Sequence, residues 1–78
     1  MTVSFASTQE LFHRYSFLVE QIAQKISVKY PHHGDVSEMM QYGYIGLIEA
    51  IDAFPAEKGL SFETYASICI QGRIVKGE

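Results

Sequence analysis

Apolar residues recur at steps of three and four in three stretches of the chain, which is the spacing of a helix that buries one face. The first stretch runs from about residue 8 to residue 29, and Pro31 follows it as a stop signal. We found no stretch with the clear apolar and polar alternation of a strand. The residues predicted to face inward are Leu11, Tyr15, Leu18, Val19, Ile22, Ala23 and Ile26.

The second stretch, residues 35–54, carries clear start and stop signals. At the start, Asp35 can accept a hydrogen bond from the first-turn amides, and Glu38 three residues later is its capping-box partner. At the end, Pro55 prevents the helix from continuing regularly. Gly43 and Gly46 each cost about 1 kcal/mol in a helix interior relative to alanine, so we expect close helix packing there. The predicted inward stripe is Val36, Met40, Gly43, Leu47, Ala50, Ile51 and Phe54.

The third stretch, residues 61–76, begins at Ser61 as an N-cap, has Glu63 in its first turn and ends before Gly77. The turn 55–59 before it is of the short kind that joins neighbouring helices. The pattern therefore predicts an all-α fold, with residues 1–78 forming a single domain, a small bundle of three main helices. The predicted inward residues of the third helix are Phe62, Ala66, Cys69, Ile70 and Ile74.

Composition narrows the class of protein. With 78 residues there is room for one core, and 47% apolar residues with a net charge of −3 exclude a disordered chain. The single cysteine, Cys69, favours a reducing compartment, and no apolar run is long enough for a membrane span, so we expect a cytoplasmic protein. His32 and His33 lack metal-ligand spacing and no catalytic or nucleotide-binding motif occurs, so we expect no enzyme, metal or cofactor.

Two further helix faces could bind partners. Between Pro31 and Glu57 there are five acids and no lysine or arginine, which suits a basic, partly apolar partner helix; alternatively, a neighbouring turn buries the apolar members and the acids are merely solvated. The outer positions of the second helix are Glu38, Gln41, Ile45, Ile48, Glu49 and Asp52. On the third helix, Tyr65 could stack on an unpaired base or simply lie at the edge of the core. Beside it are Thr64, Ile68, Gln71, Arg73, Val75 and Lys76.

Two segments, EMMQYGYIGLIEAIDAF at 38–54 and KGLSFETYA at 58–66, together resemble conserved region 2 of bacterial sigma factors. The resemblance extends from about Leu11 to Arg73, and SFETYASICIQG at 61–72 looks most like the flagellar-type branch. It implies that the second helix docks on the coiled coil of the largest subunit of core RNA polymerase. The polymerase-binding residues that it implies are Glu38, Gln41, Tyr42, Tyr44, Ile48 and Glu49.

The same resemblance implies that the third helix captures flipped bases of the promoter −10 element. Phe54 and Ala50 would line the same pocket. Ile68 and Cys69 replace a tryptophan pair of primary factors, and Cys69 and Gln71 replace arginines of the flagellar branch, so we expect weak DNA binding by the isolated chain. The implied DNA-binding residues are Lys58, Phe62, Thr64, Tyr65, Ile68, Gln71 and Arg73.

Three functions remain open from the sequence. Because 78 residues cannot encode the other domains of a sigma factor, the expectation is a fragment or a stand-alone region 2 that binds core RNA polymerase and promoter DNA. The alternative is a sigma mimic or split co-sigma subunit, which binds polymerase, an anti-sigma factor or a second sigma subunit with little DNA binding of its own. A structural bundle that self-associates through Ile45 and Ile48 is the third.

Overall fold

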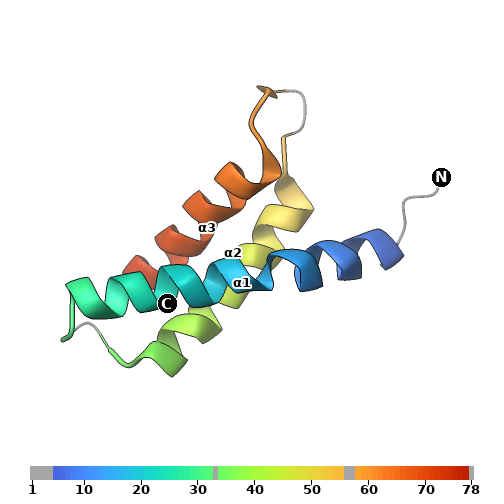
Figure 1. The fold of residues 1–78 in the computed structure, drawn as a ribbon. Helices are drawn as coiled ribbons and strands as arrows, with labels where there is room; N and C mark the ends of the chain where they lie inside the picture. Colours follow the sequence, from blue (N-terminus) through green and yellow to red (C-terminus); the bar gives the residue numbers. More distant parts are fainter. Residues whose placement is uncertain (1–4, 33, 56–57, 78) are drawn as a thin grey trace.

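The computed structural model describes residues 5–32, 34–55 and 58–77, with side chains from residue 8 onward, and contains three helices (Figure 1). Helix α1 spans Phe5–Lys29, α2 spans Val36–Ala53 and α3 spans Phe62–Lys76. The predicted all-α fold is confirmed. α1 starts three residues before the expected position 8, and the bounds of α2 and α3 lie within one residue of the expected 35–54 and 61–76. No helix in the described ranges is both long and apolar enough to cross a membrane.

Helices α2 and α3 run antiparallel as a hairpin, and α1 crosses them (Figure 1). In the turn between α2 and α3, the Lys58 N–H donates to the Pro55 carbonyl at 3.0 Å. Positions 56–57 of the predicted turn lie outside the described residues, and so does His33. This short connection holds the end of α2 next to the start of α3. Residues 54 and 62, eight positions apart in sequence, are consequently in ring contact.

Side-chain and backbone caps fix the helix ends at the predicted residues. Asp35 Oδ1 accepts from the Glu38 N–H at 2.9 Å, and Ser61 Oγ accepts from the Thr64 N–H at 3.1 Å. Gly77 adopts the left-handed conformation, with φ of 72°, and its N–H donates to the Arg73 carbonyl at 3.0 Å. Each cap satisfies a backbone group that the helix itself leaves without a partner.

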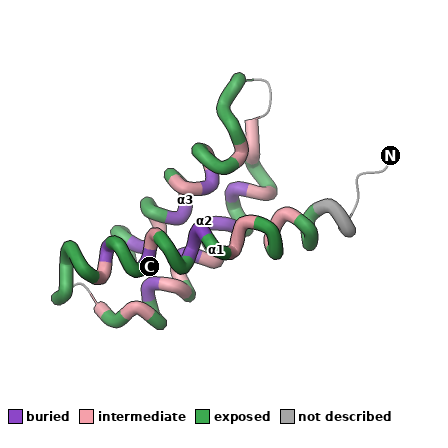
Figure 2. Tube along the Cα trace, in the orientation of Figure 1, coloured by how far each residue is buried: buried purple, intermediate pink, exposed green. Residues whose placement is uncertain are grey.

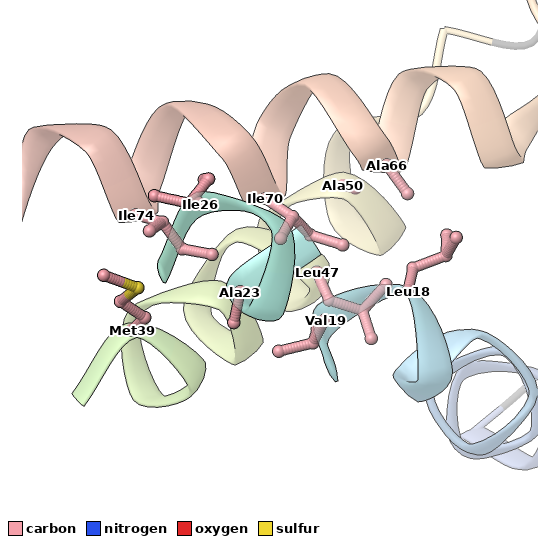
Figure 3. Packing of buried hydrophobic residues seen from close by; sticks show 10 residues of the cluster. All are labelled: Leu18, Val19, Ala23, Ile26, Met39, Leu47, Ala50, Ala66, Ile70 and Ile74. Carbon is pink, nitrogen blue, oxygen red and sulfur yellow. The ribbon is translucent and has the colours of Figure 1, made fainter. Parts of the chain in front are cut away.

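The buried positions lie where the three helices meet (Figure 2), and the side chains of the core converge from all three helices (Figure 3). One core residue, Met39, was not predicted: it is 3% exposed, whereas the expected Met40 is only half-buried. Both methionines lie one helical turn before Gly43, and the observed stripe continues through Met39. The other predicted inward residues are buried or half-buried. The buried apolar residues are Leu18, Val19, Ala23, Ile26, Met39, Leu47, Ala50, Ala66, Ile70 and Ile74.

Gly46 is the point of closest approach between α2 and α3. A Cβ atom at this position would lie 2.7 Å from the Cys69 carbonyl oxygen and 2.9 Å from Ile70 Cα, so the two backbones pack directly against each other. At Gly43 a Cβ would lie 2.8 Å from Val19 Cγ1 of α1. The close helix packing expected from these two glycines is therefore present, and it sets the relative position of the outer faces of α2 and α3.

Candidate functional site

The outer face of α2 is exposed along its whole length. We call it the α2 acidic face, and it consists of Glu38, Gln41, Ile45, Ile48, Glu49 and Asp52. Ile45 is 42% exposed and Ile48 is 50% exposed, so the expectation that a neighbouring turn buries them is wrong in this chain. Two branched apolar side chains therefore stand in water among acids, an arrangement that suits a partner surface with both apolar and basic groups.

Tyr42 and Tyr44, expected on the same docking surface, lie instead at the edge of the core. Both are half-buried and pack against the buried cluster. The Tyr44 ring stacks on Phe12 of α1 with centroids 5.7 Å apart and an interplanar angle of 27°. Tyr44 therefore attaches α1 to α2, whereas Tyr42 lies beside Ile74 of α3, and only part of each ring remains open to a partner.

Four rings form an aromatic cluster where α2 ends and α3 begins: Tyr15, Phe54, Phe62 and Tyr65. Phe62 lies between Tyr15 and Phe54, with centroids 4.9 Å and 5.4 Å away, and Phe54 contacts Tyr65 at 5.8 Å. Phe62 therefore supports its neighbours as much as it presents a surface. Ala50 is fully buried, so the expectation that it lines a base pocket is wrong.

Tyr65 is half-buried and its ring is held by Phe54. Burial raises the pKa of its phenol above the ordinary value, and Cys69 beside it adds to the shift. The phenol is therefore neutral at physiological pH and keeps its O–H donor. A neutral ring in a fixed orientation is a suitable stacking surface near phosphates.

The other predicted α3 residues also reach the surface. Ser61 Oγ donates to Thr64 Oγ1 at 2.9 Å, so the Thr64 hydroxyl is left to donate to any ligand above the first turn of α3. Lys58 is exposed in the preceding turn, Ile68 is 61% exposed and Gln71 is exposed. We call Thr64, Ile68 and Gln71 the α3 outer face; with Lys58 and Tyr65 they present mixed donors and apolar surface.

Glu49 and Arg73, which sequence reasoning placed on two different surfaces, are paired with each other. Arg73 Nε donates to Glu49 Oε1 at 3.0 Å, and Arg73 Nη2 donates to Glu49 Oε2. The hydrogen bond from Arg73 lowers the pKa of the Glu49 carboxyl; partial desolvation opposes this, while the charges of Arg73 and Lys76 add to it. The pair bridges α2 and α3 and joins the α2 acidic face to the α3 side of the molecule.

Sequence reasoning did not identify a groove of about 670 Å³ between the C-terminal halves of α1 and α3. Lys25 and Lys29 of α1 line it opposite Ser67 and Gln71 of α3. The available signal was the four-residue spacing of the two lysines, which places them on one side of a helix. In the part of the chain that the structure describes, no three His, Cys, Asp or Glu side chains are grouped to hold a metal ion.

Comparison with known proteins identifies the family. The model of sigma-70 region 2 matches residues 11–77. The chain belongs to the sigma-70 region 2 family. The resemblance that the motifs of α2 and α3 indicated is therefore confirmed.

The relatives of this region 2 domain include flagellar-type factors. It is 44% identical over 69 residues to RNA polymerase sigma factor FliA of Pseudomonas aeruginosa and 37% identical over 68 residues to RNA polymerase sigma-D factor of Bacillus subtilis. It is 34% identical over 65 residues to RNA polymerase sigma factor FliA of Escherichia coli. These matches cover 88%, 87% and 83% of the chain but only 28%, 27% and 27% of the relatives. The chain thus spans little more than a quarter of their length.

Proposed function

We propose that this region 2 domain is a transcription-initiation module without catalytic activity. It binds core RNA polymerase through the α2 acidic face and contributes to recognition and melting of the promoter −10 element through α3. The observation that carries the proposal is that the α2 acidic face and the α3 outer face are both exposed, on helices whose backbones pack directly against each other at Gly46. A single free thiol is consistent with action in the bacterial cytoplasm.

The polymerase contact rests on the chemistry of the α2 acidic face. Ile45 and Ile48 supply apolar area that a partner helix can cover, and Glu38 and Asp52 flank them with negative charge. The coiled coil of the largest polymerase subunit is the partner that the family implies. Charge complementarity would steer and orient this contact, while the buried apolar area would hold it.

The DNA contact rests on Tyr65 and its neighbours. A base that leaves the duplex can stack on the Tyr65 ring, Thr64 can donate to it, and Lys58 can contact a phosphate of the same strand. Stacking of this kind contributes about 1–3 kcal/mol per base, which offsets part of the cost of unpairing. Phe54 contacts the ring and is itself supported by Phe62, so Tyr65 does not lose much rotamer freedom on binding.

A pull-down of core RNA polymerase tests the first contact. The variant Glu38→Lys/Gln41→Ala reverses one charge and removes one amide on the α2 acidic face. Its matched control is Glu20→Lys/Gln21→Ala, which makes the same two changes at exposed positions of α1. We expect the α2 variant to lose polymerase and the α1 variant to retain it. Equal retention by both variants would contradict the docking surface.

Fluorescence anisotropy of a single-stranded −10 non-template oligonucleotide, added to the complex with core polymerase, tests the second contact. Tyr65→Ala should weaken binding about 5- to 150-fold, which corresponds to the loss of one stacked base. Tyr65→Phe keeps the ring and should bind nearly as well as the wild type. If Tyr65→Ala binds normally, or the wild-type complex does not bind, the alternative of a protein-binding sigma mimic replaces the DNA role.

A further inference from the structure

The groove between α1 and α3 combines an apolar floor with exposed cations. Ile26 is 7% exposed at its bottom and Ile22 is half-buried beside it, whereas Lys25 and Lys29 are exposed. The two lysines are four residues apart on α1, so they lie one above the other along the same wall. On the opposite wall, Gln71 of α3 is exposed and offers amide donors.

The charge around this groove has the opposite sign from that of the α2 acidic face. No acidic residue occurs among its lining residues, all of which lie in the described part of the chain. A shallower hollow next to it shares Gln71 and Val75 and adds Lys76. Arg73, the other cation of α3, is paired with Glu49. The exposed positive charge around Gln71 is therefore supplied by Lys25 and Lys29 of α1 in the groove and by Lys76 of α3 in the hollow beside it.

We propose that the groove holds the sugar–phosphate backbone of the promoter DNA that α3 engages, with Lys25 and Lys29 contacting phosphates. The inference rests on the proposed DNA-binding function and extends it to α1. Gln71 belongs to both the α3 outer face and the groove, and six residues of helix, about 9 Å, separate it from Tyr65. Tyr65 and Gln71 lie on opposite flanks of the exposed side of α3, so a strand whose base stacks on Tyr65 reaches the groove by crossing that side past Ile68, which is 61% exposed.

The wall that α3 contributes to the groove carries no cation, since its lining residues are Ser67, Gln71 and Val75. The positive charge of the groove therefore lies on the α1 wall. The apolar floor suits deoxyribose, and the Tyr30 ring, which is 54% exposed at the groove wall, offers a further stacking surface. An acidic protein helix is the competing occupant, and the experiment below separates the two.

The test measures how the affinity of the chain–polymerase complex for DNA depends on salt. The probe is a labelled −10 promoter fragment that is duplex upstream and single-stranded at the −10 element. Each lysine–phosphate contact contributes about 0.7–0.9 to the log–log salt slope, so Lys25→Ala/Lys29→Ala should reduce the slope by about 1.4–1.8. The fall in affinity between 50 and 200 mM salt then becomes about 10-fold smaller.

Three further variants make the result specific. Lys25→Arg/Lys29→Arg keeps both charges and should retain the wild-type slope. Arg14→Ala removes an exposed cation outside the groove and should leave the slope unchanged. Tyr65→Ala should weaken binding at every salt concentration without changing the slope. Circular dichroism should show that the lysine variants fold normally, because both side chains are exposed.

The outcomes separate this inference from the function on which it rests. The inference is overturned if Lys25→Ala/Lys29→Ala keeps the wild-type salt slope, or if Arg14→Ala reduces the slope equally. In either case, weaker binding by Tyr65→Ala leaves the proposed function standing. Loss of polymerase by Lys25→Ala/Lys29→Ala in the pull-down assigns the groove to a protein contact and also overturns the inference. If the wild-type complex does not bind the probe, the DNA role fails and this inference fails with it.

Discussion

Replacing Gly46 by alanine tests the contact that positions α2 against α3. The new methyl group would lie 2.7 Å from the Cys69 carbonyl oxygen and 2.9 Å from Ile70 Cα. Because comfortable carbon contacts begin near about 3.5 Å, the helices must separate by roughly 0.5–1 Å. Overpacking costs about 1–3 kcal/mol, and a backbone obstacle favours the upper end of that range. Alanine regains about 1 kcal/mol of helix propensity, so the net loss should be about 2 kcal/mol.

The other helical glycines are the controls. At Gly43 the nearest obstacles to a methyl group are the side chains of Val19 and Ile74, 2.8 Å and 3.3 Å away, and these can shift, so Gly43→Ala should cost less than Gly46→Ala. Nothing lies within 4 Å of a Cβ at Gly72, which is exposed in α3. Gly72→Ala should therefore stabilise the domain by about 0.5–1 kcal/mol.

Urea and thermal unfolding followed by circular dichroism measure these differences. For a chain of this size, a loss of about 2 kcal/mol corresponds to a fall of about 8–16 °C in Tm. The expected order of stability is Gly72→Ala, wild type, Gly43→Ala and then Gly46→Ala. If Gly46→Ala were as stable as Gly72→Ala, the direct backbone contact between α2 and α3 would be refuted.

Three other changes have defined outcomes. The pKa of Glu49 is lowered in the folded state, so the stability that its charge contributes is present above its ordinary pKa of 4.5 and is lost as the pH falls through the lowered value. The Tm values of Glu49→Gln and the wild type should therefore converge in acid. A gap in Tm that stays constant with pH would contradict the pairing with Arg73. Ser61→Ala removes the acceptor of the Thr64 N–H and should cost about 1 kcal/mol in urea unfolding, whereas Ser61→Asp should retain the cap. Leu47→Ala empties a fully buried site and should cost about 2–5 kcal/mol; a cost below about 1 kcal/mol would place Leu47 outside the core.

The helices could be predicted from the sequence because their signals are local. Asp35 and Ser61 each cap the helix that follows within three residues, and the apolar spacing defines the face of each helix without reference to its neighbours. Local spacing was insufficient at Met39 and Met40, since both stand one turn from Gly43. Which of them is buried depends on where α1 and α3 lie, and that information is not contained in α2 alone.

The candidate site was predictable only in part, for the same physical reason. The exposure of Ile45 and Ile48 follows from the periodicity of α2, and the family motifs indicate Tyr65. The pairing of Glu49 with Arg73 joins residues 24 positions apart and depends on how α2 and α3 cross. The groove between α1 and α3 requires two helices to be placed in space, so the spacing of Lys25 and Lys29 within one segment indicates a shared helix side but not the groove.

The N-terminal part of α1 extends beyond the α2–α3 hairpin, as Figure 1 shows, and among the side chains described from residue 8 onward the first buried one is Leu18. Residues 8–10 are exposed, so their amide hydrogen bonds have little packing to protect them. Amide hydrogens of this overhang should exchange by local fraying, within a small fraction of the time needed around Val19 and Ala23, where exchange requires global opening. One continuous helix therefore spans two levels of kinetic protection, with a rigid half inside the bundle and an end that opens independently of it.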